Sequence, residues 1–429
     1  MSQDINYYFD AGNRTLLAWS AIVVTDFMVG LAMPPEPHND NTAVRSKKEL
    51  MNSNERRERR YQRRKAGRDA KRANLNLLFG DYEKVFSFDN LYRAYKKCCL
   101  GVGWKASTQT YRFNALLNVN KTHNQLMTDK FKSKGFYEFK ITERGKTRHI
   151  SSVHISERVV QRCLCDNALV PMLTKSFIYD NGASLQGKGI HFTINRLKAH
   201  FSKHFRQHGN EGYALVIDFS KFFDRIPHHH LFAELQRRFD DERIISITKQ
   251  LIADFGNVGL GLGSQVSQTF ALGHPNKLDH YIKEKLGIKF YARYMDDSYL
   301  IHHDKEYLKF CLAEIQKICD ELGIVLNPRK TQIIKLSRGL PFLQARFFLT
   351  ESGRIIKICN KKSVTRMRRK LKKFRNWLDT GRFTMDDIRT SFMSWKGHIK
   401  HFNSYHSMRN LEKVYHDLYG DENRINFYL

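Results

Sequence analysis

The sequence predicts an α+β protein in which short strands alternate with helices. Runs rich in β-branched and aromatic residues on either side of a turn indicate hairpins at residues 136–150 and 291–301. A continuous apolar run, residues 213–217, is typical of a buried strand. Residues 305–322 carry apolar side chains at helical spacing. The 429 residues, of which 41% are hydrophobic, are enough for two or three domains with a large core.

The charge of the chain predicts a polyanionic partner. With 73 Lys and Arg against 43 Asp and Glu, the formal net charge is +30, far more than solubility requires. Nucleic acid is the leading partner, because its phosphates reward dense basic charge through counterion release, and an anionic membrane surface is the alternative. Seven cysteines without disulfide or zinc spacing indicate reduced thiols in a cytoplasmic protein.

The N-terminal region combines an apolar segment with a basic one. Residues 16–33 resemble a membrane span, but Asp26 opposes insertion by about 2.5 kcal/mol or more, so we expect a buried helix and no membrane contact. Residues 55–72 read ERRERRYQRRKAGRDAKR and predict a helix with basic side chains all round. A solvated helix is the alternative, but mutual repulsion favours phosphate contacts. The predicted nucleic-acid-binding residues here are Arg56, Arg57, Arg59, Arg60, Arg63, Arg64, Lys65 and Arg68.

Helical and extended patterns alternate through the first half of the chain. Residues 86–119 look helical, and the first hairpin turns at residues 143–146. A helix is predicted over residues 156–173, with Ser156 as its N-cap. A glycine-rich loop, residues 184–189, then leads into a helix over residues 191–207.

The second half continues with helices, a hairpin and a basic end. Helices are predicted over residues 229–254 and from Ser264 to about Leu286, separated by a loop with four glycines. A strand over residues 332–336 and a hairpin over 340–348 follow. Residues 361–429 look helical and begin with a dense basic run. Its predicted nucleic-acid-binding residues are Arg366, Arg368, Arg369 and Lys370.

Three carboxylates form the strongest candidate site. Asp296 and Asp297 lie at the tip of the second hairpin, where like charges repel unless a cation neutralises them. An isolated Asp-Asp turn is ordinarily solvated, but Asp218 ends the buried strand and supplies a third carboxylate from a separate element. This arrangement suits two cations roughly 3.5–4 Å apart for phosphoryl transfer. Mg²⁺ is expected, with Mn²⁺ as a possible substitute.

Five stretches in order now resemble the motifs of prokaryotic reverse transcriptases, the lineage of group II intron enzymes, retrons and diversity-generating elements. The resemblance covers about Lys140 to Phe348. The matching stretches are LVIDFSKFF at 215–223, GLGLGSQVSQ at 259–268, YMDD at 294–297, LNPRKT at 326–331 and LPFL at 340–343.

The resemblance implies a right-hand polymerase fold behind a basic helical extension. Its palm would carry the catalytic hairpin on an antiparallel sheet. The implied domains are an RNA-binding N-terminal extension at 1–90, fingers with part of the palm at 91–210, the palm at 211–348 and a helical thumb at 349–429.

The resemblance also implies catalytic roles. Asp218 and Asp296 would hold both metals and Asp297 would support the site, while Phe219 next to Asp218 is assigned to the metal and nucleotide site. Lys330 would protonate the leaving pyrophosphate, or act only as a positive charge.

Five further residues are implied in nucleotide binding. Phe223 would lie under the sugar and exclude a 2′-hydroxyl, although a core aromatic is the alternative. Gly263 would let the backbone approach the templating base pair, and Gln268 is a further candidate for substrate contact. Lys146 and Arg148 would clamp the triphosphate, the alternative being a solvated hairpin. The family often has glycine where this chain has Gln344.

The implied function is RNA-directed DNA synthesis from dNTPs, with a primer or cDNA strand and a cognate noncoding RNA template. After residue 348 we expect neither the zinc-type cysteine pairs of an appended endonuclease nor an integrase or ribonuclease H domain. The architecture is therefore similar to that of stand-alone, defence-associated "unknown group" enzymes. Template-independent synthesis, as in abortive-infection relatives, stays open. Retron, diversity-generating and maturase-like RNA-binding roles also stay open, and no protein partner is indicated.

Overall fold

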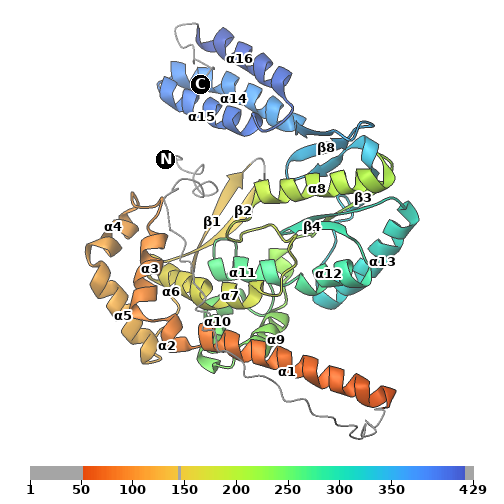
Figure 1. Ribbon diagram of the computed structural model, residues 1–429. Coiled ribbons are helices and arrows are strands. Elements are labelled where there is room, and N and C mark those ends of the chain that lie inside the picture. Colours follow the sequence, from red (N-terminus) through yellow and green to blue (C-terminus); the bar gives the residue numbers. More distant parts are fainter. Residues whose placement is uncertain (1–51, 144–145, 421–429) are drawn as a thin grey trace, which may run out of the picture.

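The computed structural model describes residues 52–143 and 146–420, and its mixture of helices and sheets confirms the predicted α+β class (Figure 1). The apolar segment 16–33 lies outside the described residues. The core consists of three hydrophobic clusters. Two of them share the central sheet, and the third belongs to the C-terminal helices alone.

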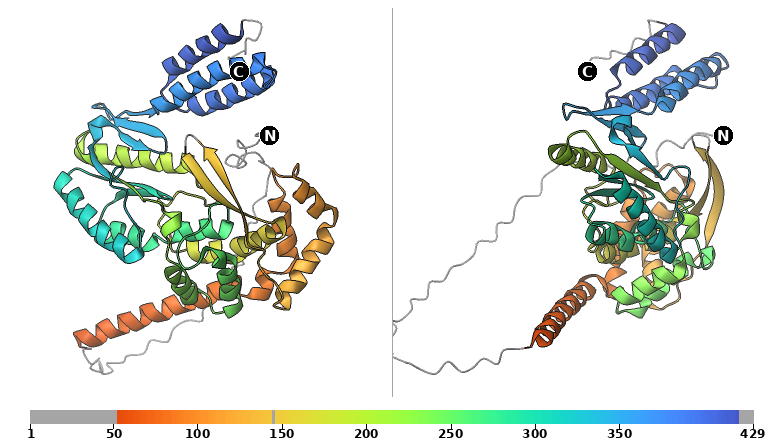
Figure 2. Two further views of the ribbon diagram at one scale, coloured as in Figure 1. Left: turned by 180° about the vertical axis from the view of Figure 1, so that it is seen from behind. Right: turned by 90° about the vertical axis from the view of Figure 1, so that its right-hand side faces the viewer.

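Helix α1, Ser53–Phe79, confirms the predicted basic helix and has no buried residue. It projects from the body (Figure 2) and is attached near its C-terminal end. There Asn76 Nδ2 donates to the Arg238 carbonyl at 2.8 Å, and Arg72 pairs with Asp240. Four shorter helices follow, α2 (Tyr82–Val85), α3 (Phe88–Cys98), α4 (Ala106–Phe113) and α5 (Ala115–Met127). Because Tyr82 and Val85 are already buried in the main core, the packed body begins before residue 91.

The first hairpin pairs β1 (Phe136–Glu143) with β2 (Lys146–Val153), as predicted. A nearly continuous helical stretch follows it, made of α6 (Ile155–Leu164), a π-helical turn (Cys165–Leu169) and α7 (Val170–Thr174). The predicted N-cap, Ser156, is wrong. The helix begins one residue earlier than predicted, at the buried Ile155, so His154 is the N-cap. The Ser156 N–H donates to His154 Nδ1 at 3.3 Å.

The central sheet explains why residues 213–217 are apolar without alternation. Its antiparallel strands run in the order β4-β5-β3-β6, with helices α8 and α13 packed on its two faces. Ala214 and Val216 share a hydrophobic cluster with α8, whereas Leu215 and Ile217 share another with α13, so β3 is buried on both sides. The bounds are α8 (Ile190–His208), β3 (Tyr213–Asp218), β4 (Phe290–Tyr294), β5 (Asp297–His302), α13 (Lys305–Leu322) and β6 (Gln332–Lys335).

Each of the two helices predicted between β3 and β4 is divided. The first breaks where Asp241 caps a new helix by accepting from the Arg243 N–H at 2.9 Å. The second breaks at Pro275, which cannot continue a helical hydrogen-bond ladder. The helices are α9 (His228–Arg238), α10 (Glu242–Ile252), α11 (Gln265–Gly273) and α12 (Asn276–His280); the short turns are Phe223–Arg225, Ala253–Phe255 and Tyr281–Lys285.

A three-stranded sheet follows a short turn, Leu336–Arg338, and contains one strand that the sequence did not predict. The predicted hairpin is β7 (Leu340–Phe342) and β8 (Ala345–Leu349), and the additional strand is β9 (Ile355–Cys359). The β7–β8 turn places Leu343 and Gln344 at φ values of 46° and 64°. Two successive left-handed residues are typical of a two-residue hairpin turn, so Gln344 takes a position that glycine fills more readily.

The C-terminal helices form a bundle with its own core. They are α14 (Lys361–Asp379), α15 (Met385–Ile399) and α16 (Tyr405–Tyr419), and they lie beyond the three-stranded sheet (Figure 1). Asn403 joins the bundle to β9, because its N–H donates to the Lys357 carbonyl at 2.7 Å.

Two further predictions concern membranes and thiols. Within the two described ranges, none of the helices is both long enough and apolar enough to cross a bilayer. All seven cysteines are described, and none of them forms a disulfide.

Candidate active site

The strand register brings the three predicted carboxylates together. Asp218 at the end of β3 lies directly opposite Asp297, the first residue of β5. Asp296 occupies the adjoining β4–β5 turn, and its carbonyl accepts a hydrogen bond from the Phe219 N–H at 3.3 Å. Residues far apart in sequence therefore converge at one end of the central sheet.

The site is short of positive charge. Burial raises the pKa of Asp297 to about 7, and the charges of Asp296 and Asp218 act in the same direction. Burial also raises the pKa of Asp296. A carboxyl group with a raised pKa is one whose negative charge is insufficiently compensated, so a cation at this place would be stabilised.

Lys330 and Asn327 hold the Asp218 carboxylate. The Lys330 ammonium group forms an ion pair with Asp218 Oδ1, and Asn327 Nδ2 donates to Oδ2 at 2.9 Å. Burial acts to lower the pKa of Lys330, but its hydrogen bond to Asp218 and the nearby aspartate charges raise it overall. The sequence analysis missed Asn327, although it belongs to the same LNPRKT stretch as Lys330.

The carboxylates suit a divalent cation, although other side chains already engage the oxygens of Asp218. In the described residues, no three His, Cys, Asp or Glu side chains are arranged to hold a metal ion. Here Lys330 and Asn327 engage the Asp218 oxygens, but the Lys330 side chain is 52% exposed and has room to move away. Carboxylate oxygens are the ligands that Mg²⁺ prefers, and the raised pKa values of Asp296 and Asp297 indicate charge that a cation would neutralise.

Phe223 and Phe219 follow Asp218 but differ in exposure. Phe223 is half-buried on the turn after β3, and its carbonyl accepts from the Leu260 N–H in the glycine-rich loop at 2.8 Å. The Phe219 side chain is 3% exposed and belongs to the main core. The side chain of Phe219 therefore packs in the core, and its predicted part in the metal and nucleotide site would be played by its backbone, whose N–H meets the Asp296 carbonyl.

The first hairpin brings positive charge toward the carboxylates. Arg148 on β2 is exposed, and its charge opposes the rise in the pKa of Asp296. The side chain of Lys146 lies outside what the structure describes.

Gly263 is required by a contact that the sequence analysis did not predict. Its φ is 116°, and a Cβ at this position would lie 2.8 Å from the Ser151 carbonyl oxygen. The Ser151 N–H in turn donates to the Leu262 carbonyl at 2.8 Å. Within the chain, the close approach at Gly263 is therefore to β2, and the predicted approach to a templating base pair stays a prediction. Gln268 is exposed, and its Nε2 donates to Ser184 Oγ at 2.8 Å in the other glycine-rich loop.

Gly263→Ala should lower the free energy of unfolding by about 2–4 kcal/mol, because it combines backbone strain with a steric overlap against Ser151. Urea denaturation measures this change. Gly67→Ala is the matched control, since a Cβ there meets nothing within 4 Å and alanine favours the helix. Equal stability of the Gly263 variant and the wild type would contradict the contact.

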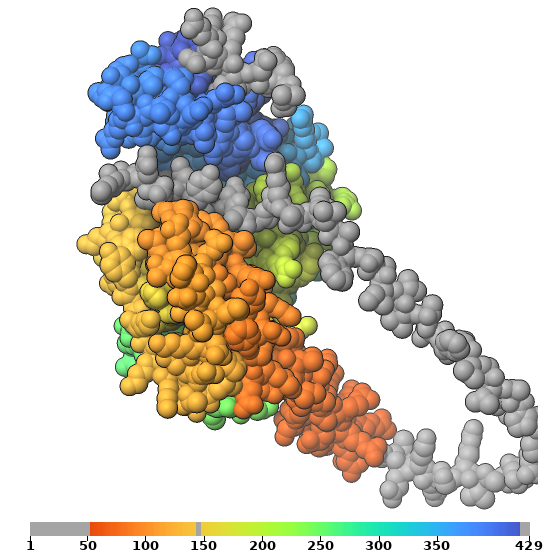
Figure 3. Space-filling view, turned by 90° about the vertical axis from the view of Figure 1, so that its left-hand side faces the viewer, coloured from red at the N-terminus to blue at the C-terminus, as the bar shows by residue number. Residues whose placement is uncertain are grey.

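The two predicted nucleic-acid-binding groups lie at opposite ends of the molecule (Figure 2). All eight predicted basic residues of α1 are exposed, and the space-filling view shows the helix standing clear of the body (Figure 3). On α14, Arg366, Arg368 and Arg369 are exposed. Lys370 is less exposed than these arginines: its Nζ donates to Ser391 Oγ on α15 at 2.9 Å, and burial lowers its pKa.

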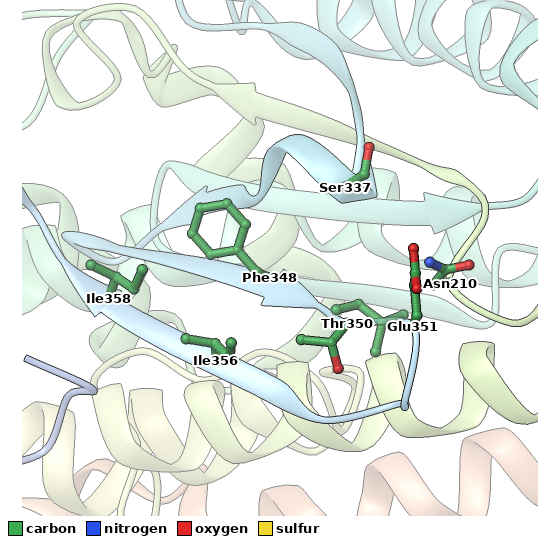
Figure 4. Close-up of a pocket in the computed structure, with 8 residues that line it drawn as sticks. Asn210, Ser337, Phe348, Thr350, Glu351, Ile356 and Ile358 are labelled. Atoms are coloured by element: carbon green, nitrogen blue, oxygen red, sulfur yellow. The ribbon is translucent and has the colours of Figure 1, made fainter.

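A pocket of about 430 Å³ lies against the three-stranded sheet (Figure 4). Phe348, Ile356 and Ile358 form its apolar side, and Thr350 and Glu351 are at one end. The lining residues do not include Asp218, Asp296 or Asp297, so the pocket is separate from the candidate active site.

Fold and site together fit the class of metal-dependent phosphoryl-transfer proteins, since carboxylates suited to divalent cations are gathered on a sheet between helices. Comparison with known families makes the class specific. Residues 132–347, half of the chain, match the family described as "Reverse transcriptase (RNA-dependent DNA polymerase)". The chain therefore belongs to the reverse transcriptase family. Domains of this family generally use divalent metal ions.

Solved structures with similarity to the chain include three telomerases. Telomerase from Candida albicans, in complex with the TWJ fragment of telomeric RNA, is 12% identical with a TM-score of 0.42, over 67% of this chain and 60% of that one. Apo telomerase from Candida tropicalis truncated from its C-terminal domain is 15% identical with a TM-score of 0.41, over 57% and 60%.

The third is apo telomerase from Candida tropicalis, 12% identical with a TM-score of 0.42, over 70% of this chain and 62% of that one. The chain thus spans 60–62% of these telomerases. A comparison with curated proteins finds no match.

Proposed function

We propose that this reverse transcriptase copies a structured noncoding RNA and acts in antiphage defence in the prokaryotic cytoplasm. The observation that carries the polymerase mechanism is the meeting of Asp218, Asp296 and Asp297, with Lys330 and Arg148 contributing positive charge. In the proposed right-hand arrangement, the first hairpin belongs to the fingers, the central sheet is the palm and the C-terminal bundle is the thumb.

The three aspartates would hold two Mg²⁺ ions, with Mn²⁺ as a possible substitute and the Phe219 backbone beside them. Bound there, the ions would lower the pKa of the primer hydroxyl and stabilise the leaving pyrophosphate. Lys330 would supply a proton or a positive charge to that leaving group. Arg148 would bind the triphosphate of the incoming dNTP, and Lys146 would assist it from the same hairpin.

The RNA partner is proposed from the charge of α1 and α14. Helix α1 carries ten basic residues, eight Arg and two Lys, against three acidic residues, and none of its residues is buried. The exposed face of α14 adds Arg366, Arg368 and Arg369 near the proposed path of the template and primer strands. Dense exposed charge of this kind binds phosphates through counterion release.

The decisive experiment is to purify the enzyme from cells and sequence both the bound RNA and the DNA product. A product complementary to one bound RNA supports templated synthesis. A product unrelated to any RNA contradicts it and supports the template-independent alternative.

The defence role is proposed from the basic helix α1 that precedes the polymerase region, an arrangement similar to that of defence-associated enzymes. It is tested by phage plating efficiency with wild type and Asp296→Asn. Equal plating on both strains would exclude DNA synthesis as the basis of protection.

Phe223→Val should raise the use of ribonucleotides relative to deoxynucleotides by about 10–100-fold, because losing the ring relieves a clash with the 2′-hydroxyl worth about 1.4–2.7 kcal/mol. The ratio of kcat/KM for rNTP and dNTP measures it. Phe348→Val, at the separate pocket, is the control. A core role for Phe223 would instead lower stability and leave the ratio unchanged.

A further inference from the structure

Arg293 is the largest fully buried side chain of the described residues, and it lies just before the YMDD stretch. Its Nε donates to Asp279 Oδ1 at 2.8 Å, and its Nη2 donates to Asp279 Oδ2 at 2.7 Å. The Tyr291 hydroxyl also donates to Asp279 Oδ1, at 2.6 Å. The carboxylate of α12 therefore fixes the orientation of the guanidinium group on β4.

The remaining donors of Arg293 reach two backbone carbonyls. Nη1 donates to the Met295 carbonyl at 3.0 Å, and Nη2 donates to the Leu272 carbonyl on α11 at 3.0 Å. Met295 has a φ of 55°, a left-handed conformation that a long unbranched side chain rarely adopts. Met295 is also the residue immediately before Asp296. One rigid fork thus ties the strained turn to two helices.

We infer that Arg293 is a positioning residue that holds the Met295 turn and thereby sets Asp296 and Asp297 opposite Asp218. This inference rests on the proposed catalytic role of these aspartates. A buried ion pair is a weak source of stability, since apolar residues of similar volume often replace one without loss. If Arg293 served only to neutralise Asp279, it would not need to contact Met295. A role in fixing the turn does require that contact. A strained residue beside a functional group persists only where its surroundings hold it.

Arg293→Lys tests the inference, because lysine keeps the charge but loses the planar fork. It should lower kcat for extending a primed poly(rA) template by roughly 10–100-fold, the loss expected from a displacement of about 1 Å. The KM for dNTP and the affinity for template-primer should change little. Mg²⁺ alone should also raise the thermal unfolding midpoint of this variant less than that of the wild type.

Tyr291→Phe is the matched control. It removes another hydrogen bond to Asp279 and leaves the fork on Met295 in place, so it should lower the unfolding midpoint while keeping kcat. If Tyr291→Phe lowers kcat as much as Arg293→Lys does, the effect is one of general stability and the inference is wrong.

Met295→Gly supplies the second arm, since glycine adopts a positive φ without strain. In the Met295→Gly background, the loss caused by Arg293→Lys should shrink at least about threefold, a coupling within the range for residues in contact. If the wild-type enzyme extends primers and the losses in kcat caused by the two substitutions simply multiply, the inference is wrong. An inactive wild-type enzyme would instead refute the proposed function. If Arg293→Lys does not fold, Asp279→Asn takes its place in the same cycle.

Discussion

Asp296→Asn should reduce DNA synthesis at least about 10³-fold, because the lost carboxylate removes several kcal/mol of stabilisation from the metal-dependent transition state. Asparagine keeps the shape of the side chain and removes only its charge. Primer extension with dNTPs and Mg²⁺ on a primed poly(rA) template measures the loss. Asp320→Asn, on the exposed side of α13, is the matched control and should retain wild-type activity.

The same variant should fold at least as stably as the wild type in the absence of metal. Burial raises the pKa of Asp296, so above its usual pKa the ionised carboxylate destabilises the folded state and its removal relieves that effect. Loss of activity together with an unchanged or raised unfolding midpoint therefore indicates a chemical role. Substantial synthesis by Asp296→Asn would contradict the proposed site, and a lowered midpoint would indicate a structural role instead.

Local patterns predicted the elements and the carboxylates well. The run at residues 213–217 is apolar at every position because both faces of β3 are covered, and Asp218 stands where that burial ends. Asp296 and Asp297 are conspicuous because a charged pair interrupts residues that favour strands. Lys330 followed from the resemblance, and the structure places its ammonium group in an ion pair with Asp218.

Features that depend on tertiary contacts did not emerge from the sequence. Arg293 is one of 73 basic residues, and only the packing of α12 against β4 shows that it is buried and paired. The need for glycine at position 263 comes from Ser151, more than 100 residues earlier. Strand β9 was not predicted, because its run of residues is short and its hydrogen bonds come from pairing with β8. Lys370 follows exposed arginines in the sequence, but its place on the helix turns its side chain toward α15, where it bonds to Ser391.

The basic surface of α1 should supply most of the salt dependence of RNA binding. If each of six arginines contacts one phosphate, replacing all six should lower the slope of log K against log salt by about 4–5, at about 0.7–0.9 per contact. Glutamine is the replacement, because its helix propensity is close to that of arginine and the helix should persist. The positions changed are Arg56, Arg57, Arg60, Arg63, Arg64 and Arg68.

The readout is binding of the co-purified RNA between 50 and 200 mM salt, over which six such contacts are worth about 10³-fold in affinity. Extension of a primed poly(rA) template should stay near wild type, because α1 is attached to the body through Arg72 and Asn76, which are unchanged. Glu55→Gln with Glu58→Gln is the matched control on the same helix, and by removing negative charge it should not weaken binding. An unchanged salt slope in the six-arginine variant would mean that α1 is a solvated helix and that the RNA is held elsewhere, leaving the exposed arginines of α14 as the remaining basic surface of the proposal.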